Sequence, residues 1–246
     1  AATGGSDTSL TSMSPPDPTA EEAQYEEITN TADSDDGLFT VYRQEGDLYF
    51  EIADSLLGVD MLLISRVSGV QSGMGGFLPA GAAVNRQMVR FTRESDRILL
   101  RTYSGEAVAD DTLAIALSVE SNYFAPILGS FDINARNRED DSSVINVTEF
   151  FEGDTPAISG LRPAQRSSYQ VRRLDGARSF IGRVRSYPMN VNVRHTLTYD
   201  AGNPPSDEQA HTISMEMNQS LVLLPREPMR PRHADPRVGY FTIDRV

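Results

Sequence analysis

Three histidines are the side chains of this sequence best suited to bind a metal, and their spacing decides whether they could do so. His195 lies within the run Val191–Tyr199, where apolar and polar residues alternate as in a β-strand with one buried face. His211 begins a second alternating run, and a hairpin centred on Asn203 would set His195 directly opposite it on the same face. His195 and His211 are therefore a candidate metal pair, which would still need a third ligand.

The alternative for this pair is structural: two histidines at the rim of a core, each hydrogen-bonded to backbone or tyrosine. A register slip of one residue would also separate them. Asp207, opposite Tyr199 in the same hairpin, would be the nearest carboxylate. His233 follows Pro231 in a proline- and arginine-rich segment and is interpreted as a solvated linker residue. No histidine belongs to a His-Glu-x-x-His motif, so we expect a non-catalytic chain with no metal or cofactor of its own.

Arginine supplies every formal positive charge of the chain, because lysine is absent. Between Arg162 and Arg194 there are eight arginines and one acid, Asp175. Because a guanidinium forks onto a carboxylate, this region could hold an acidic partner, and the nearest acidic segment is the N-terminal part of the same chain. The predicted interaction patch consists of Arg162, Arg166, Arg172, Arg173, Arg183 and Arg185. The alternative is a solvated arginine face.

The net charge of −13 is concentrated in the first 60 residues, which hold 14 acids and one arginine. Residues 61–246 are balanced, with 21 of each sign. An acidic chain repels nucleic acid and anionic membrane surfaces, so neither is an expected partner. No apolar run has the length of a membrane span, and the absence of cysteine excludes disulfides and thiolate metal sites.

Short β-rich runs separated by turn residues dominate the chain from Gly37 onward. The predicted strands include 38–43 and 47–52, which form a hairpin, then 61–68, 87–93, 97–103, 112–119, 127–135, 143–151, 169–174, 179–187, 189–199, 211–224 and 238–243. The remaining helix candidates, Ile52–Leu57 and a segment from Phe150, are short. The glycine-rich stretch 68–83 lacks the Gly-Lys-Ser/Thr ending of a phosphate loop and is predicted to be a flexible loop, whose length and Met/Phe content could make it a contact loop. This pattern predicts a mainly β fold, an antiparallel sandwich or barrel-like sheets with few short helices.

Three regions follow from this pattern. Residues 1–36 are predicted to be an acidic, Ser/Thr/Pro-rich leader, disordered or ordered by a partner, in which Thr19–Ile28 could form one or two helical turns. Residues 37–224 are predicted to form the β domain, and residues 225–246 a Pro/Arg linker followed by a closing strand. The chain begins Ala1-Ala2-Thr3 without methionine, which favours an exported, processed protein or a trimmed one.

Several long runs, in order along the chain, resemble one bacterial family. They are GLFTVYRQEGDLYFEIADSLLGVDMLLISRVS (37–68), VTEFFEGDTPAISG (147–160), YQVRRLDGARSFI (169–181), SYPMNVNVRHTLTY (186–199), SDEQAHTISMEMNQSLVLLP (206–225) and MRPRHADPRVGYF (229–241). The chain from Gly37 onward is similar to the domain of unknown function that precedes the catalytic domain of large exported zinc-dependent metalloproteases. In that family the zinc site lies in the later catalytic domain, so the resemblance maps no zinc ligand onto these residues.

The resemblance implies export to the periplasm or beyond, and a protein partner. We expect a non-catalytic N-terminal module that acts as a pro-domain, shield or substrate-positioning module. An alternative is a processed structural subunit on the extracytoplasmic face of a larger membrane complex, such as a respiratory or photosynthetic one. A carbohydrate-binding sandwich is a third possibility that rests on fold analogy alone, without tryptophan to build an aromatic platform.

Overall fold

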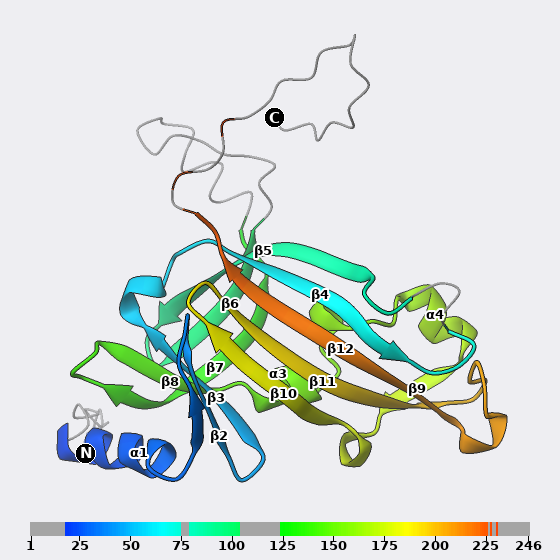
Figure 1. The fold of residues 1–246 in the computed structure, drawn as a ribbon, viewed down its shortest axis with the longest axis horizontal. Helices are drawn as coiled ribbons and strands as arrows, with labels where there is room; N and C mark the ends of the chain where they lie inside the picture. Colours follow the sequence, from blue (N-terminus) through cyan, green and yellow to red (C-terminus); the bar gives the residue numbers. More distant parts are fainter. Residues whose placement is uncertain (1–17, 75–78, 104–123, 226, 228–229, 231–246) are drawn as a thin grey trace, which may run out of the picture.

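The computed structural model describes residues 18–74, 79–103, 124–225, 227 and 230. Within these residues, twelve strands form one antiparallel sheet that curls around its own core (Figure 1). The strand order is β1-β2-β3-β8-β7-β6-β5-β4-β12-β11-β10, with β9 paired to β11 off this path. The prediction of a mainly β fold is confirmed, and the sheet does not close into a barrel.

The strands are β1 (Asp33–Asp35), β2 (Thr40–Gln44), β3 (Asp47–Ala53), β4 (Met61–Val70), β5 (Ala83–Glu94), β6 (Arg97–Tyr103), β7 (Ile127–Asn137), β8 (Ser142–Asn146), β9 (Val171–Leu174), β10 (Phe180–Tyr187), β11 (Asn190–Ala201) and β12 (Thr212–Leu223). The helices described are α1 (Pro18–Thr29), α3 (Thr148–Glu152) and α4 (Pro163–Ser168). Short 3₁₀ turns are η1 (Asp54–Leu56), η2 (Pro156–Ile158), η3 (Gly176–Arg178) and η4 (Glu208–Ala210). The strands predicted at 112–119 and 238–243 lie outside the described residues.

The first hairpin shows how closely local sequence sets this fold. Gln44 pairs with Asp47, which leaves Glu45 and Gly46 as a two-residue turn with φ of 51° and 102°. Positive φ at both turn positions matches the right-handed twist of the flanking strands, and glycine adopts it without strain. The predicted hairpin is therefore confirmed.

The inner face of the curled sheet carries a core rich in phenylalanine. Phe39 contacts Phe50 and Phe91 with ring centroids 5.5 and 5.6 Å apart, and Phe151 on α3 lies 6.0 Å from Phe50. Residues from both ends of the sheet meet in this core, because Val184 of β10 and Leu48 of β3 belong to the same buried cluster. Hydrophobic burial between the two ends therefore holds the sheet in its curled form.

Side chains close the seam between the two ends of the sheet. The guanidinium of Arg43 on β2 donates to the carbonyls of Ile181 and Gly182 on β10, and Asp35 accepts from the amide of Ser186. One backbone bond adds to these, from the Leu38 amide to the carbonyl of Tyr187 at 2.8 Å. Strand β10 thus has its outer edge capped without a ladder, which protects it from pairing with other chains.

Helix α1 and strand β1 lie within the segment expected to be a leader. Helix α1 packs mainly on β7 and also touches β2 (Figure 1). Its contacts with the sheet include the Tyr25 hydroxyl, which donates to the buried carboxylate of Glu51, and the Glu27 carbonyl, which accepts from the Gln44 side chain on β2; Ile28 is partly buried. Helix α1 includes Thr19–Ile28, where one or two helical turns were expected, and polar contacts help to hold this segment because it is poor in apolar residues. Residues 1–17 lie outside the described part.

Candidate interaction face

The two candidate metal ligands do not meet. His195 pairs with Met217, and the strands are linked by a turn that includes η4, so the hairpin is shifted from the predicted register by six residues. His211 precedes β12 with φ of 51° and is exposed, whereas His195 is fully buried on the inner face. The predicted pair is therefore wrong, and no group of three metal-ligating side chains occurs within the described part of the chain.

His195 instead belongs to a set of buried and half-buried polar groups that holds the η2 loop under the sheet. The Gln219 amide nitrogen donates to the Ile158 carbonyl at 3.0 Å and lies 2.9 Å from His195 Nε2. Asn85 and Gln87 both donate to the carbonyl of Ala157, at 2.9 and 3.0 Å. Burial lowers the pKa of His195 to about 4, so the ring is neutral at neutral pH. These groups are structural, and the alternative interpretation of His195 as a core histidine is the one the geometry supports.

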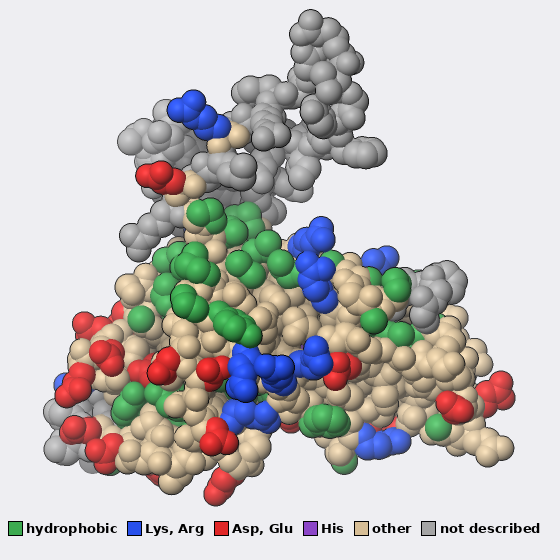
Figure 2. Space-filling model, viewed as in Figure 1, with side chains coloured by type: hydrophobic (Ala, Val, Ile, Leu, Met, Phe, Trp, Pro, Cys, Tyr) green, Lys and Arg blue, Asp and Glu red, His purple; other side chains and the backbone are tan. Residues whose placement is uncertain are grey.

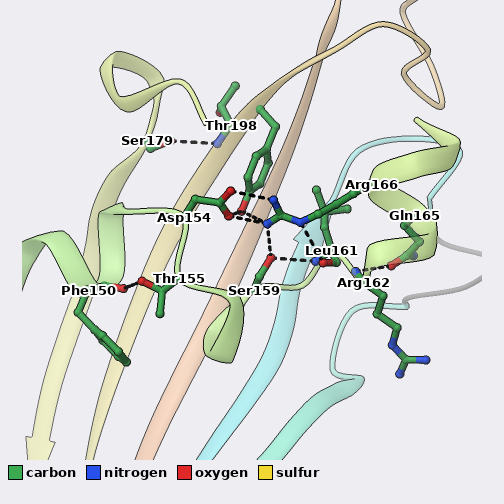
Figure 3. Close-up of polar contacts among 11 residues, drawn as sticks. Phe150, Asp154, Thr155, Ser159, Leu161, Arg162, Gln165, Arg166, Ser179 and Thr198 are labelled. Carbon is green, nitrogen blue, oxygen red and sulfur yellow. Dashed lines mark hydrogen bonds and ion pairs between the residues drawn. The ribbon is translucent and has the colours of Figure 1, made fainter. Parts of the chain in front are cut away.

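Arg166, from the predicted patch, is also a structural residue. Its guanidinium forks onto Asp154 at 2.7 and 2.5 Å and donates to the Ser159 hydroxyl at 3.1 Å (Figure 3). The same guanidinium lies 5.0 Å from the ring centroid of buried Tyr199, whose hydroxyl donates to Asp154. The hydrogen bond from Arg166 lowers the pKa of the Asp154 carboxyl. This cluster fastens α4 and the loop before it to strand β11.

The other arginines of the predicted patch lie at separate positions on the structure. Arg173 pairs with Asp200 on β11 at 2.8 Å. Arg162 and Arg172 are exposed and have no ionic partner among the residues that the structure describes. Among the described residues of the acidic N-terminal segment, Asp35 forms an ion pair with this patch, 3.7 Å from Arg185. The patch is not one surface, and the described part of the segment contacts it through this ion pair, while residues 1–17 lie outside the described part.

Strand pairing brings a different set of arginines together on the outer face. On β11, Arg194 faces outward and pairs with Asn218, which pairs with Arg66 of β4. A bulge in β10 lies beside it and contains the exposed Arg183. One row nearer the β10–β11 turn, Arg185, Asn192, Ser220, Ile64 and Arg86 follow one another across β10, β11, β12, β4 and β5. We call Arg66, Arg86, Arg183, Arg185 and Arg194 the basic band.

The next outward-facing row is apolar except for Asn190 of β11, which pairs with both Tyr187 and Val222. Val222, Leu62, Met88 and Tyr103 are successive cross-strand neighbours on β12, β4, β5 and β6. Tyr187 is 45% exposed and Met189, in the turn that follows, is 51% exposed. We call the row from Tyr187 and Met189 to Tyr103 the apolar row. Figure 2 shows arginine side chains over the middle of this face, next to a group of apolar side chains.

Sequence reasoning found Arg183 and Arg185 but missed Arg66, Arg86 and Arg194 as members of the same surface. Arg66 and Arg86 come from strands more than 90 residues earlier in the chain, and only β12–β4 and β4–β5 pairing places them beside β11. Alternation along each run was the available signal, because it puts these arginines on outward-facing positions. Which outward rows are adjacent depends on register, which alternation leaves open.

Neither a curated protein nor a solved structure matches this chain. None of the described helices has the length and apolar character needed to cross a bilayer. A family model described as a domain of unknown function (DUF5118) matches residues 23–70, and a second, also a domain of unknown function (DUF5117), matches residues 81–246.

The boundary between the two family models does not divide the structure. Strand β3, within the first match, pairs with β8 of the second, and β4 pairs with β12. The two matched regions therefore form one sheet. Since the second family model covers about two thirds of the sequence, the chain belongs to the DUF5117 family of domains of unknown function.

Proposed function

We propose that this chain is a non-catalytic interaction module that binds a protein partner through the outer face of β10, β11, β12, β4 and β5. One observation carries the proposal: the basic band and the apolar row lie next to each other on that face. Exposed apolar side chains rimmed by polar and charged groups are typical of protein interaction sites. The buried histidine and the Arg166 cluster serve the fold and need no substrate.

The sequence resemblance gives the proposed setting. The module would precede the catalytic domain of an exported zinc-dependent metalloprotease and act there as a pro-domain, shield or substrate-positioning module. Zinc would belong to that catalytic domain, and the location would be periplasmic or extracellular. The second candidate is a structural subunit on the extracytoplasmic face of a membrane complex, which the same outer face would equally serve.

The experiment pairs the chain with the catalytic half of its own parent protein, produced separately. We expect association that is weakened at least tenfold by Met189→Asp, because a charge would then be buried in the apolar row. Ile127→Asp is the matched control, because Ile127 is 49% exposed against 51% for Met189 and lies on β7, outside the five strands of the proposed face. Association unchanged by Met189→Asp would contradict the proposed face.

Activity provides an independent check. The purified chain with added zinc should not cleave casein, and chelator-sensitive cleavage would overturn the non-catalytic role. Isolation of the native protein distinguishes the two settings: a chain continuing into a His-Glu-x-x-His domain supports the protease module. A mature chain found only with unrelated membrane subunits supports the structural subunit instead.

A further inference from the structure

The basic band contains positive charge that the described part of the chain does not neutralise. Arg183 and Arg86, at its two ends, are exposed and have no ionic partner among the described residues. Arg185 and Arg194 have long contacts only, 3.7 Å to Asp35 and 3.6 Å to Glu216. A protein of net charge −13 therefore has a local surface of the opposite sign.

The polar side chains between these arginines are occupied with one another. Ser220 donates to Asn192 at 2.6 Å and Asn218 donates to Ser220 at 3.1 Å. These three short side chains form a hydrogen-bonded chain across β11 and β12, and the guanidinium groups of the basic band lie on both sides of it. The arginines of the basic band are therefore the polar groups of this region that remain available to a partner.

Strand geometry sets the size of the ligand. Arg183 on β10 and Arg86 on β5 are separated by four strand spacings, which amounts to about 19 Å at ~4.8 Å per spacing. An extended peptide covers that distance with about six residues. The apolar row runs parallel to the band and one row away, so alternate side chains of such a peptide could reach both.

We infer that the outer face binds an extended acidic segment of a protein partner, which lies across the strands. Its carboxylates contact the guanidiniums of the basic band, and its apolar side chains contact Met189, Val222 and Leu62. This inference rests on the proposed function and names the chemistry of the partner. Arginine favours this role because its planar fork matches a carboxylate in bidentate geometry.

A polyanionic surface fits the same face less well. Asp35 and Glu216 lie beside the band, and the chain as a whole is strongly acidic, so a broad anionic membrane or a nucleic acid would meet repulsion around the arginines. A short segment contacts the band alone. Pairing to the outer edge of β10 is unsuitable for such a segment, because side chains already cap that edge.

The test measures fluorescence anisotropy of a labelled peptide of about ten residues that contains glutamate, leucine and phenylalanine. A control peptide has glutamine in place of every glutamate. We expect the acidic peptide to bind the full chain, the control to bind at least tenfold more weakly, and affinity to fall with added salt. Binding of both peptides alike, or of neither at millimolar concentration, would overturn the inference.

Variants locate the site. Replacing both Arg183 and Arg86 with glutamine should weaken peptide binding about tenfold, as expected for loss of two exposed ion pairs. Replacing both Arg162 and Arg172 removes the same charge from exposed positions off the band and should leave binding unchanged. Equal losses in the two double variants would mean that net charge alone drives binding, which would overturn the assigned site.

Three further outcomes would also overturn it: stronger binding to phosphatidylglycerol vesicles, stronger binding to oligothymidine, or a dimer in sedimentation that Met189→Asp dissociates. The last would show that a second copy covers the face. If the peptide fails to bind while Met189→Asp still weakens association with the catalytic half, the proposed function stands and only the acidic nature of the partner is wrong.

Discussion

The hydroxyl of Tyr25 on α1 lies 3.3 and 3.2 Å from the two carboxylate oxygens of Glu51 on β3, which is 8% exposed. Tyr42, Ser142 and Asn137 donate to the same carboxylate, so neutral donors hold it and no arginine forms an ion pair with it within the described residues. Burial raises the pKa of the Tyr25 hydroxyl, which keeps its proton available for donation. Tyr25 thus ties an acidic helix with little apolar surface to a buried carboxylate of the sheet.

The anchoring of α1 predicts that Tyr25→Phe loosens this helix selectively. Loss of a hydrogen bond to a partly buried carboxylate costs about 1–3 kcal/mol. Amide hydrogen exchange should accelerate over residues 22–29 while strands β4, β11 and β12 keep their protection. Tyr49→Phe is the control, because its hydroxyl donates to a different carboxylate, that of Asp47, at 3.2 Å. Unchanged exchange in Tyr25→Phe would show that Ile28 and neighbouring contacts hold the helix.

Burial of His195 predicts a loss of stability in mild acid. Its folded pKa of about 4 lies below the unfolded value near 6.5, so the unfolded state takes up a proton first as pH falls. The contribution is fully present above pH 6.5 and is lost progressively down to about pH 4, by about 3 kcal/mol at most. Urea unfolding measured from pH 7 to pH 4 checks this.

The matched control for His195 is the exposed His211. His211→Asn removes a histidine from the surface and should leave the pH dependence of unfolding unchanged, whereas His195→Asn should flatten it, even if it lowers stability throughout. If the two variants show the same slope between pH 6.5 and pH 4, His195 is not the group responsible.

The seam predicts a strict requirement for a small residue at Gly37. A Cβ atom at this position would lie 2.4 Å from the Ser186 hydroxyl and 2.5 Å from the Tyr187 amide nitrogen. Gly37→Ala should therefore force the β10 edge away from β2 and lower the free energy of unfolding by about 1–3 kcal/mol. Thermal unfolding of both variants checks this. Gly69→Ala is the control: its Cβ atom would lie 3.5 Å from its nearest neighbour, so it should lower the free energy of unfolding less.

The fork between Arg166 and Asp154 predicts that Arg166→Lys is not conservative. Lysine keeps the charge but loses one of the two parallel hydrogen bonds and the contact with Ser159, so we expect a loss of about 1 kcal/mol. Arg173→Lys, at an arginine whose side chain is 78% exposed, should lower the free energy of unfolding less than Arg166→Lys does. Equal effects would mean that the fork adds nothing to a simple ion pair.

Alternation predicted most of the described strands, because a half-buried strand shows a period of two in its sequence. It did not predict the register between β11 and β12. The observed shift of six residues is an even number, so His195 keeps its inward face although its partner changes to Met217. The metal pair failed for that reason, while the burial of His195 was foreseeable.

Helix α3 was predicted only in part, since the run 143–151 was also interpreted as strand. The Asn146 side chain accepts from the Thr148 amide, and the Thr148 hydroxyl accepts from the amide of Leu48, which ends β8 and turns the chain into a helix. The basic band depended on pairing between strands far apart in sequence, and no local pattern specifies such pairing. The position of the Pro156–Ile158 turn likewise depends on side-chain amides of β5 and β12, which donate to its carbonyl groups and could not be placed from local sequence.

The capped edge of β10 has a consequence for how relatives of this chain could diverge. The side chains of Arg43, Glu152 and Asp35 bind the backbone groups of β10 that an added strand would use. A partner therefore cannot bind this edge simply by extending the sheet. Under the proposed function, recognition would then pass through the exposed and half-buried side chains of the outer face. A few exchanges among exposed residues could redirect the module to a new partner while the curled sheet stays the same.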